Sequence, residues 1–422
     1  MISFAYRLVS LLVRLGCPIL ILHFSTPTVL GEYYLFSTFL TFAIFLISLE
    51  AAVPFSRRYL QSSSESSRFQ VFSSFIGNQI IVSAVTAIPL FGYYISTNSI
   101  SLTRAMLFFL VLVTSACSNE TGRFFWNIGR GDVATQRDVW RSLVFVAAII
   151  LSVSVYQTVV SGISLGLIAI SEMIILNADV RRWGKGAKGS WVSNRRFNAW
   201  RISVLGMLEQ FSLSLPQVLH LQFLAVLPFF ERTLIDRGLG LSSVGAFSFQ
   251  YAGVQAGLSL LLIPLVADTR RAILSAQTST QYEHAHKMTF ILLTRISIVA
   301  ALFSLAAYLV VPFIADLMHK DLKMQPLGIL AVMLTAIAST YNAAVSLLYA
   351  KSERILKANS VTLICMMPLV CLMLFNIVGN CEIGPYVFPA IAAASFLQIA
   401  ARAAYHLNSW KDYVSKSGVL NY

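Results

Sequence analysis

Five ionisable side chains lie inside long apolar stretches of the sequence, where a charge is costly and is by default a functional candidate. They are two arginines, two glutamates and one histidine: Arg14, Arg295, Glu172, Glu209 and His220. The planar guanidinium of arginine binds anionic oxygens in a bidentate geometry, whereas a buried carboxyl group or an imidazole can take up and release a proton. The arginines are therefore candidates to bind an anionic group, and the other three residues are candidates to carry a proton.

Plainer interpretations of these residues stay open. An arginine near a helix end can extend to the membrane surface and act as an anchor, and a buried glutamate can form a structural salt bridge. Glu120 lies close to a predicted helix end and is expected at the interface. The sequence contains no CxxC pair, nucleophile motif or glycine-rich phosphate loop, so we expect no catalytic residue, no metal and no cofactor.

The elements that must carry these side chains are membrane-spanning helices. Of the 422 residues, 57% are hydrophobic and only 12% are charged, against about 45–50% and about 25% in soluble domains. A hydrocarbon core about 30 Å thick requires about 20 apolar residues per helix. We therefore predict an all-α integral membrane protein with about twelve transmembrane helices. They are expected at residues 8–24, 33–54, 71–95, 102–117, 143–157, 163–177, 208–229, 244–266, 289–313, 327–349, 360–377 and 386–405.

The formal net charge of +13 has a simple topological explanation. Basic residues gather in alternate connections, around 57–68, 123–141, 181–201, 270–287 and 351–357. Because Lys and Arg accumulate in cytoplasmic loops, we predict a multi-pass protein of the cell inner (plasma) membrane with both termini in the cytoplasm. A nucleic acid partner would require an exposed basic surface, and we expect none.

The connections divide the chain into two halves. Those expected outside are short, the longest at 230–243 and 314–326, whereas the internal connection 179–201 is rich in Gly, Lys and Arg. Such a composition is typical of a flexible linker. We therefore predict an N-terminal six-helix bundle at 1–178 and a C-terminal six-helix bundle with a short cytoplasmic tail at 202–422.

Similar segments in the two halves indicate an internal repeat. Residues 29–34 open the second predicted helix and residues 244–247 open the eighth, while 129–132 follow the fourth and 350–353 follow the tenth. Both matches keep the same sense relative to the membrane. This favours parallel repeats about an axis along the membrane normal.

Some of these residues also resemble the motifs of a known family. Residues 28–36 (TVLGEYYLF) and 230–236 (FERTLID), followed by Leu239-Gly240 and 243–247 (SVGAF), are similar to segments of Wzx-type polysaccharide or O-antigen flippases. These belong to the multidrug/oligosaccharidyl-lipid/polysaccharide exporter superfamily. The resemblance implies alternating access through a central cavity between the two bundles, which is commonly cationic. It also implies movement coupled to an ion gradient, for which Glu172, Glu209 and His220 are the candidate residues.

The resemblance also implies a substrate and partners. The substrate would be a polyprenyl-diphosphate-linked oligosaccharide, moved from the cytoplasmic to the outer leaflet for surface polysaccharide biosynthesis, with Arg14 and Arg295 facing its diphosphate. Membrane lipids, a polysaccharide polymerase and chain-length proteins are the other expected partners.

Other functions stay open. A small-molecule or drug cation antiporter of the same superfamily would share this architecture. A membrane polymerase or glycosyltransferase would need a larger external loop carrying catalytic groups than this sequence offers, and a structural or receptor role is a further alternative.

Overall fold

The described part of the chain is almost entirely helical. The computed structural model describes residues 2–48, 52–97, 101–184, 226–255, 282–317, 320, 322, 324–348, 364–379 and 382–417. Within those ranges all regular structure is α-helix, which confirms the predicted all-α class. Six helices of the described residues are long and apolar enough to cross a membrane. The predicted span 208–229 falls mostly outside the described residues.

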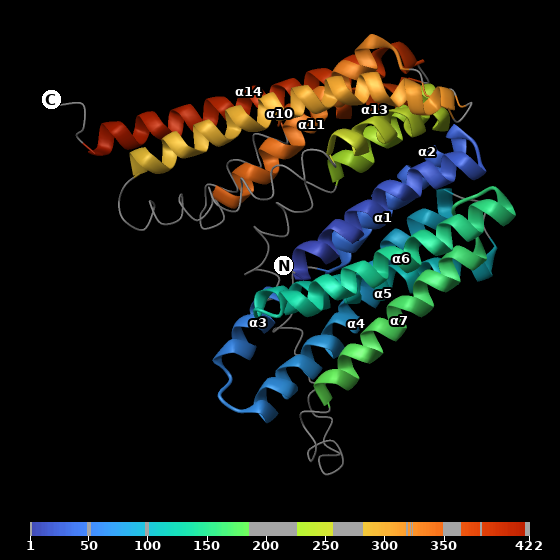
Figure 1. Cartoon of the computed structure of the whole chain (residues 1–422), viewed down its shortest axis with the longest axis vertical. Helices are drawn as coiled ribbons and strands as arrows, with labels where there is room; N and C mark the ends of the chain where they lie inside the picture. Colours follow the sequence, from blue (N-terminus) through green and yellow to red (C-terminus); the bar gives the residue numbers. More distant parts are fainter. Residues whose placement is uncertain are drawn as a thin grey trace. The chain divides into compact units, whose positions relative to one another are not determined.

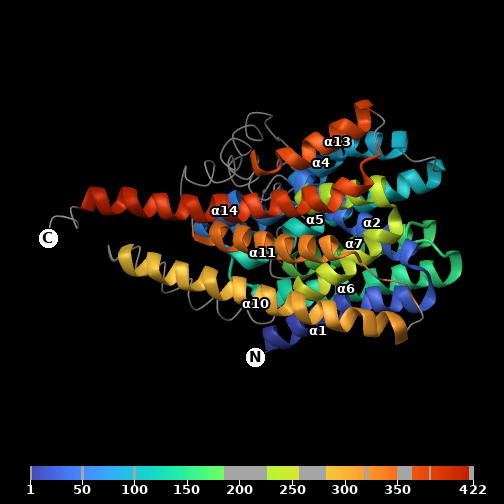
Figure 2. The ribbon, with the colours of Figure 1, turned by 90° about the horizontal axis from the view of Figure 1, so that it is seen from above.

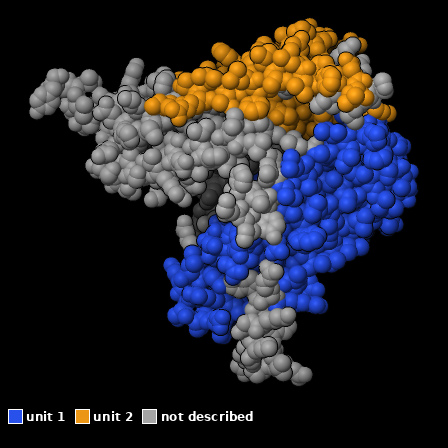
Figure 3. Space-filling model, in the orientation of Figure 1, with its two compact units in different colours: residues 1–25, 36–225 blue, residues 26–35, 226–422 orange. Residues whose placement is uncertain are grey.

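The chain forms two compact units, shown in Figure 3. Unit 1 comprises residues 1–25 and 36–225, and unit 2 comprises residues 26–35 and 226–422. The helices of the first half of the chain are α1 (Ile2–Phe24), α2 (Pro27–Ser48), α3 (Ala52–Gln61), α4 (Glu65–Thr97), α5 (Leu102–Asn127), α6 (Gly131–Tyr156) and α7 (Gly162–Gly184). Those of unit 2 include 226–239, 241–255, α10 (Tyr282–Leu317), α11 (Pro326–Leu348), α13 (Met367–Gly379) and α14 (Gly384–Ser417).

Unit 1 is a helix bundle with an aromatic core at one end. Helix α6 packs against α1 and α7, and α5 packs against α4 and α7, as Figure 1 shows. The rings of Phe72 and Phe75 from α4 meet those of Phe124 and Phe125 from α5, with Phe75 and Phe124 stacked at 5.0 Å. Phe55 of α3 joins this core at 5.4 Å from Phe75. Burial of these rings holds α3 against the ends of α4 and α5.

Unit 2 depends on a close backbone contact between its two segments of chain. The first turns of α2 lie against helix 241–255, where a methyl group on Gly31 would overlap the carbonyl oxygen of Leu241. A methyl group on Gly245 would overlap the carbonyl oxygen of Pro27 and lie 3.2 Å from the amide nitrogen of Gly31. Only glycine permits this approach at these two positions.

The rest of unit 2 is a layer of long helices. Helices α10, α11 and α14 run side by side, and Figure 2 shows α11 between the other two. The hydroxyl groups of Thr335 on α11 and Ser395 on α14 lie 3.1 Å apart in the buried contact between these helices.

Two predicted connections are largely helical. The expected external loop 230–243 is occupied by the ends of helices 226–239 and 241–255, separated only by Gly240, whose φ of +82° favours glycine. The connection expected around 118–142 shrinks to 128–130, because α5 and α6 extend into it from both sides. Both predictions were wrong because each predicted helix was ended where charged residues begin, although a charge that the protein compensates can lie inside a helix.

The Gly31–Gly245 contact yields a stability prediction. Replacing Gly245 with Ala should destabilise the purified protein by about 1–3 kcal/mol, the usual cost of overpacking, and lower its thermal midpoint as followed by tryptophan fluorescence. Gly253→Ala on the same helix is the matched control, because a methyl group there meets nothing within 4 Å. An equal midpoint for the two variants would contradict the close contact.

Candidate functional site

Unit 1 buries two ion pairs between α6 and α7. Arg141 Nε donates to both carboxylate oxygens of Glu172, at 2.8 and 3.1 Å. Arg137 Nε lies 2.8 Å from Asp179 Oδ2, with both side chains only 6% exposed. Arg137 and Arg141 are one helical turn apart, and Glu172 and Asp179 are two turns apart, so each pair of like charges shares a helix face.

Further buried polar contacts join α6 to α5, and α5 to α3. The remaining nitrogens of Arg137 donate to the hydroxyl and the carbonyl of Ser118, at 3.0 and 3.1 Å. Glu120, fully buried, accepts from the backbone amide of Ala52 at 2.9 Å and pairs with Arg123 at 3.0 Å. The guanidinium groups of Arg123, Arg137 and Arg141 therefore each face a carboxylate. This arrangement is typical of structural salt bridges rather than of an anion-binding site.

Unit 2 buries an arginine without a carboxylate partner at ion-pair distance among the described residues. Arg232 is 4% exposed, and its Nε donates to the Ser248 hydroxyl at 2.9 Å while Nη1 donates to the Pro228 carbonyl at 3.0 Å. Its guanidinium also lies over two rings, 5.4 Å from the centroid of Tyr251 and 6.0 Å from that of Tyr34. The aromatic faces supply the negative potential that compensates the buried cation.

The neighbouring carboxyl group is less well satisfied. Glu231 is 1% exposed, and its Oε1 has no hydrogen-bond partner within the described ranges. A buried polar oxygen left in this state requires an explanation, such as a proton, an ion or a solute that visits it. Glu231 and Arg232, with Tyr34, Ser248 and Tyr251 around them, are here called the Glu231–Arg232 cluster.

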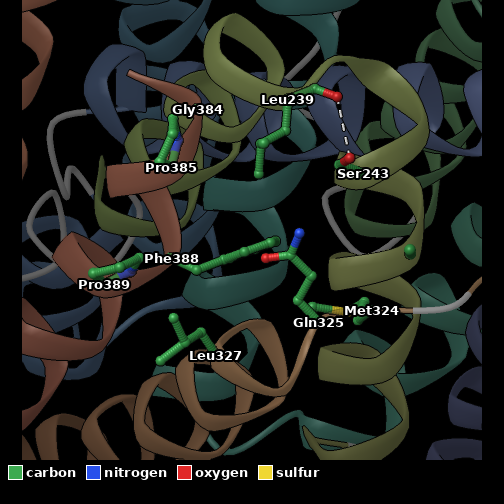
Figure 4. Close-up of a pocket in the computed structure, with 10 residues that line it drawn as sticks. Leu239, Ser243, Met324, Gln325, Leu327, Gly384, Pro385, Phe388 and Pro389 are labelled. Atoms are coloured by element: carbon green, nitrogen blue, oxygen red, sulfur yellow. Dashed lines mark hydrogen bonds between the residues drawn. The ribbon is translucent and has the colours of Figure 1, made fainter. Parts of the chain in front are cut away.

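An aromatic stack connects the Glu231–Arg232 cluster to a cavity. The rings of Tyr251 and Phe247 are stacked, with centroids 6.4 Å apart and an interplanar angle of 4°. Phe247 in turn stacks on Phe388 of α14, with a centroid distance of 6.0 Å and an angle of 23°. Phe388 lines a cavity of about 480 Å³ whose walls come from residues 239–246, 324–327 and 384–389 of unit 2. Figure 4 shows this cavity, which has no charged residue in its lining.

The candidate residues predicted from the sequence lie in different environments. Glu172 is buried and paired with Arg141. Arg295 is exposed on α10. Arg14 belongs to α1, but its side chain lies outside the described part, as do Glu209 and His220 altogether. The binding and coupling roles of these five residues stay predictions.

Sequence reasoning missed the most unusual residues of the structure. Arg137 and Arg141 were expected in a cytoplasmic connection, and Glu231 and Arg232 in an external one, yet all four are buried or nearly so. Glu120 was expected at the interface and is fully buried. The one available signal was the motif at 230–236, which marked Glu231 and Arg232 by resemblance. Among the described residues no group of three His, Cys, Asp or Glu side chains could hold a metal.

Comparisons with known proteins support the fold. No protein-family model and no curated protein sequence matches the chain. Among solved structures, the inward-facing conformation of a multidrug resistance MATE family transporter of the MOP superfamily matches with a TM-score of 0.66 and 13% identity, over 96% of this chain and 95% of that one. The outward-facing conformation of such a transporter matches with a TM-score of 0.55 and 13% identity, over 97% and 93%. A mutant of the Vibrio cholerae MATE transporter VcmN gives a TM-score of 0.54 and 12% identity, over 98% and 95%. The chain therefore has the fold of the MATE transporters of this superfamily.

The ion pairs of unit 1 yield a second stability prediction. Asp179→Asn should cost about 3–5 kcal/mol of unfolding free energy, because Arg137 would remain buried without a counter-charge. The double variant Arg137→Met, Asp179→Leu should lose less than the single variant, since neither charge remains. Asp132→Asn is the control, because the Asp132–Arg130 pair is 3.5 Å apart and the Asp132 side chain is 70% exposed. Chemical unfolding of the purified variants measures these differences. An unchanged unfolding free energy for Asp179→Asn would contradict a structural role of the Arg137–Asp179 pair.

Proposed function

We propose that the protein is a secondary transporter that moves an amphipathic solute across the membrane by alternating access. The observation that carries this proposal is the match of nearly the whole chain to both the inward-facing and the outward-facing conformation of MATE transporters. A fold found in two such states accommodates the required change of conformation. Six described helices able to span a membrane are consistent with this function.

A small organic solute is the class that the comparisons favour. The matched transporters are described as multidrug resistance proteins, and we extend that class of solute to this chain as part of the proposal. The protein would then be an antiporter that exports small amphipathic molecules in exchange for an ion that enters down its gradient.

A lipid-linked glycan is the second candidate, and one structural observation favours it. The segments that resemble the Wzx-type flippases pack together within unit 2: Gly31 meets Gly245, and Arg232 lies over the ring of Tyr34. Under this alternative the solute is a polyprenyl-diphosphate-linked repeat unit, with Arg14 and Arg295 as proposed diphosphate ligands. A polymerase and chain-length proteins would act next on the exported unit.

Ion coupling would involve buried acidic groups. Glu172, Glu209 and His220 are retained as proposed coupling residues, and we add Glu231. Its buried carboxyl group has an oxygen without a hydrogen-bond partner in the described part of the chain, so it has spare capacity to take up a proton or a cation. Burial disfavours a charged carboxylate and so favours a bound proton, whereas the positive charge of the adjacent Arg232 would repel a metal cation.

Deletion of the gene separates the two solutes. If the protein is a small-molecule antiporter, the deletion strain should accumulate lipophilic dyes and keep its surface glycan. If it is a flippase, the polymer should be lost and single lipid-linked repeat units should accumulate on the cytoplasmic face, as detected by mass spectrometry. Repeat units exposed outside without polymerisation would indicate a polymerase, and an unchanged strain in both assays would contradict the proposed transporter.

Glu231 provides a test of coupling. Glu231→Gln keeps the size of the side chain but removes its ability to carry a proton, so the variant should insert normally and lose most gradient-driven export in proteoliposomes. Glu382→Gln is the matched control, because Glu382 precedes α14 and is exposed. Export by Glu231→Gln at the wild-type rate, with the same dependence on the proton gradient, would exclude Glu231 from coupling.

A further inference from the structure

The cavity of unit 2 has the features of a small-molecule site. Its volume of about 480 Å³ lies within the range of roughly 300–1,000 Å³ that ligand pockets occupy. Its lining residues include two prolines, a phenylalanine, a glutamine and a serine, and none of them is charged. A charged group in such a pocket would lose its hydration without gaining a partner, so the chemistry favours an uncharged ligand.

The apolar wall of the cavity is held in place before any ligand arrives. One side of Phe388 stacks on Phe247, which in turn stacks on Tyr251. A methyl group added to Gly328 of α11 would lie 3.2 Å from the ring of Phe388. A side chain there would push the ring away, so the glycine allows Phe388 to lie close over the start of α11.

The first turn of α14, which forms another part of the wall, is equally constrained. A methyl group on Gly384 would lie 2.9 Å from the carbonyl oxygen of Gly238, so the first turn of α14 packs directly on the end of helix 226–239. Pro385 and Pro389 add rigid apolar faces to that turn. Because these walls are fixed, a ligand would not have to order them on binding, which reduces the entropic cost.

Polar groups line one part of the same cavity. The amide of Gln325 projects into it in Figure 4, and no hydrogen bond ties that side chain to the described residues. The Ser243 hydroxyl donates to the Leu239 carbonyl at 3.1 Å, which leaves its oxygen able to accept a hydrogen bond. The cavity therefore combines flat apolar faces with a free amide and an acceptor hydroxyl.

We propose that this cavity binds an uncharged ring that has an apolar face and a hydrogen-bonding edge. The apolar face would pack on Phe388 and Pro385, and the edge would bond to Gln325 and Ser243. Two sources supply such a ring: a neutral sugar of a glycan, or a neutral aromatic amide among small organic solutes. The inference deepens the proposed function by naming the solute's chemistry, and it is tested by binding alone, so its failure is distinct from a failure of transport.

The test uses the full-length protein in lipid nanodiscs and saturation-transfer NMR of four probes. Lactose and 2-naphthamide represent the two neutral sources, and glucuronate and 2-naphthoate are charged counterparts. At least one neutral probe should bind saturably. Its charged counterpart should bind at least about tenfold more weakly, because the lining of the cavity offers no opposite charge. Saturable binding of lactose would identify a sugar site, and binding of 2-naphthamide alone an aromatic one.

Variants place the binding in the cavity. Phe388→Ala should lower the affinity for the neutral probe about tenfold, because the ring contact is lost. Gln325→Leu should lower this affinity by about as much, because the hydrogen-bonding amide is removed. Gln325 is exposed, so its replacement leaves the fold intact even if Phe388→Ala does not. Phe396→Ala is the matched control on the same helix, with a ring 58% exposed and outside the cavity lining. No saturable binding of either neutral probe, or equal affinity of wild type and Gln325→Leu, would overturn the proposal.

Discussion

Charge inside an apolar helix bundle must be neutralised by the protein itself, because water is not there to do it. In unit 1 ion pairs meet this constraint: Arg141 faces Glu172 and Arg137 faces Asp179 across the contact of α6 and α7. A shift of either helix by one residue would separate both pairs. The ion pairs therefore define the register of these helices, which apolar side chains alone would leave less specific.

Unit 2 meets the same constraint differently. Arg232 is compensated by the faces of Tyr34 and Tyr251 and by neutral oxygens, and no carboxylate lies at ion-pair distance in the described structure. The nearby carboxyl group of Glu231 keeps one oxygen without a hydrogen-bond partner there. A group whose bonding is incomplete can respond to a proton or a solute, whereas a fully paired group resists change. Unit 2 therefore contains a buried carboxyl group with capacity to respond to a proton or a solute.

The motif that resembles the flippases also has a structural explanation. Gly31 and Gly245 allow two backbones to touch, and this contact brings Tyr34 over Arg232. Phe247, within the same motif, stacks between Tyr251 and the cavity residue Phe388. The motif residues thus serve both the close packing of the two segments and the surroundings of Arg232.

The sequence by itself determined the class of the protein, because membrane insertion depends on apolar length and composition, which are properties of the chain read one segment at a time. It also marked Glu172 as a costly intramembrane acid. Only the tertiary structure decided that Arg137 and Arg141 are buried ion-pair partners, and that Glu231 and Arg232 belong to a helix. The physical reason is that a charge ends a hydropathy pattern whether or not it is paired, and its partner comes from another helix that no local pattern can identify.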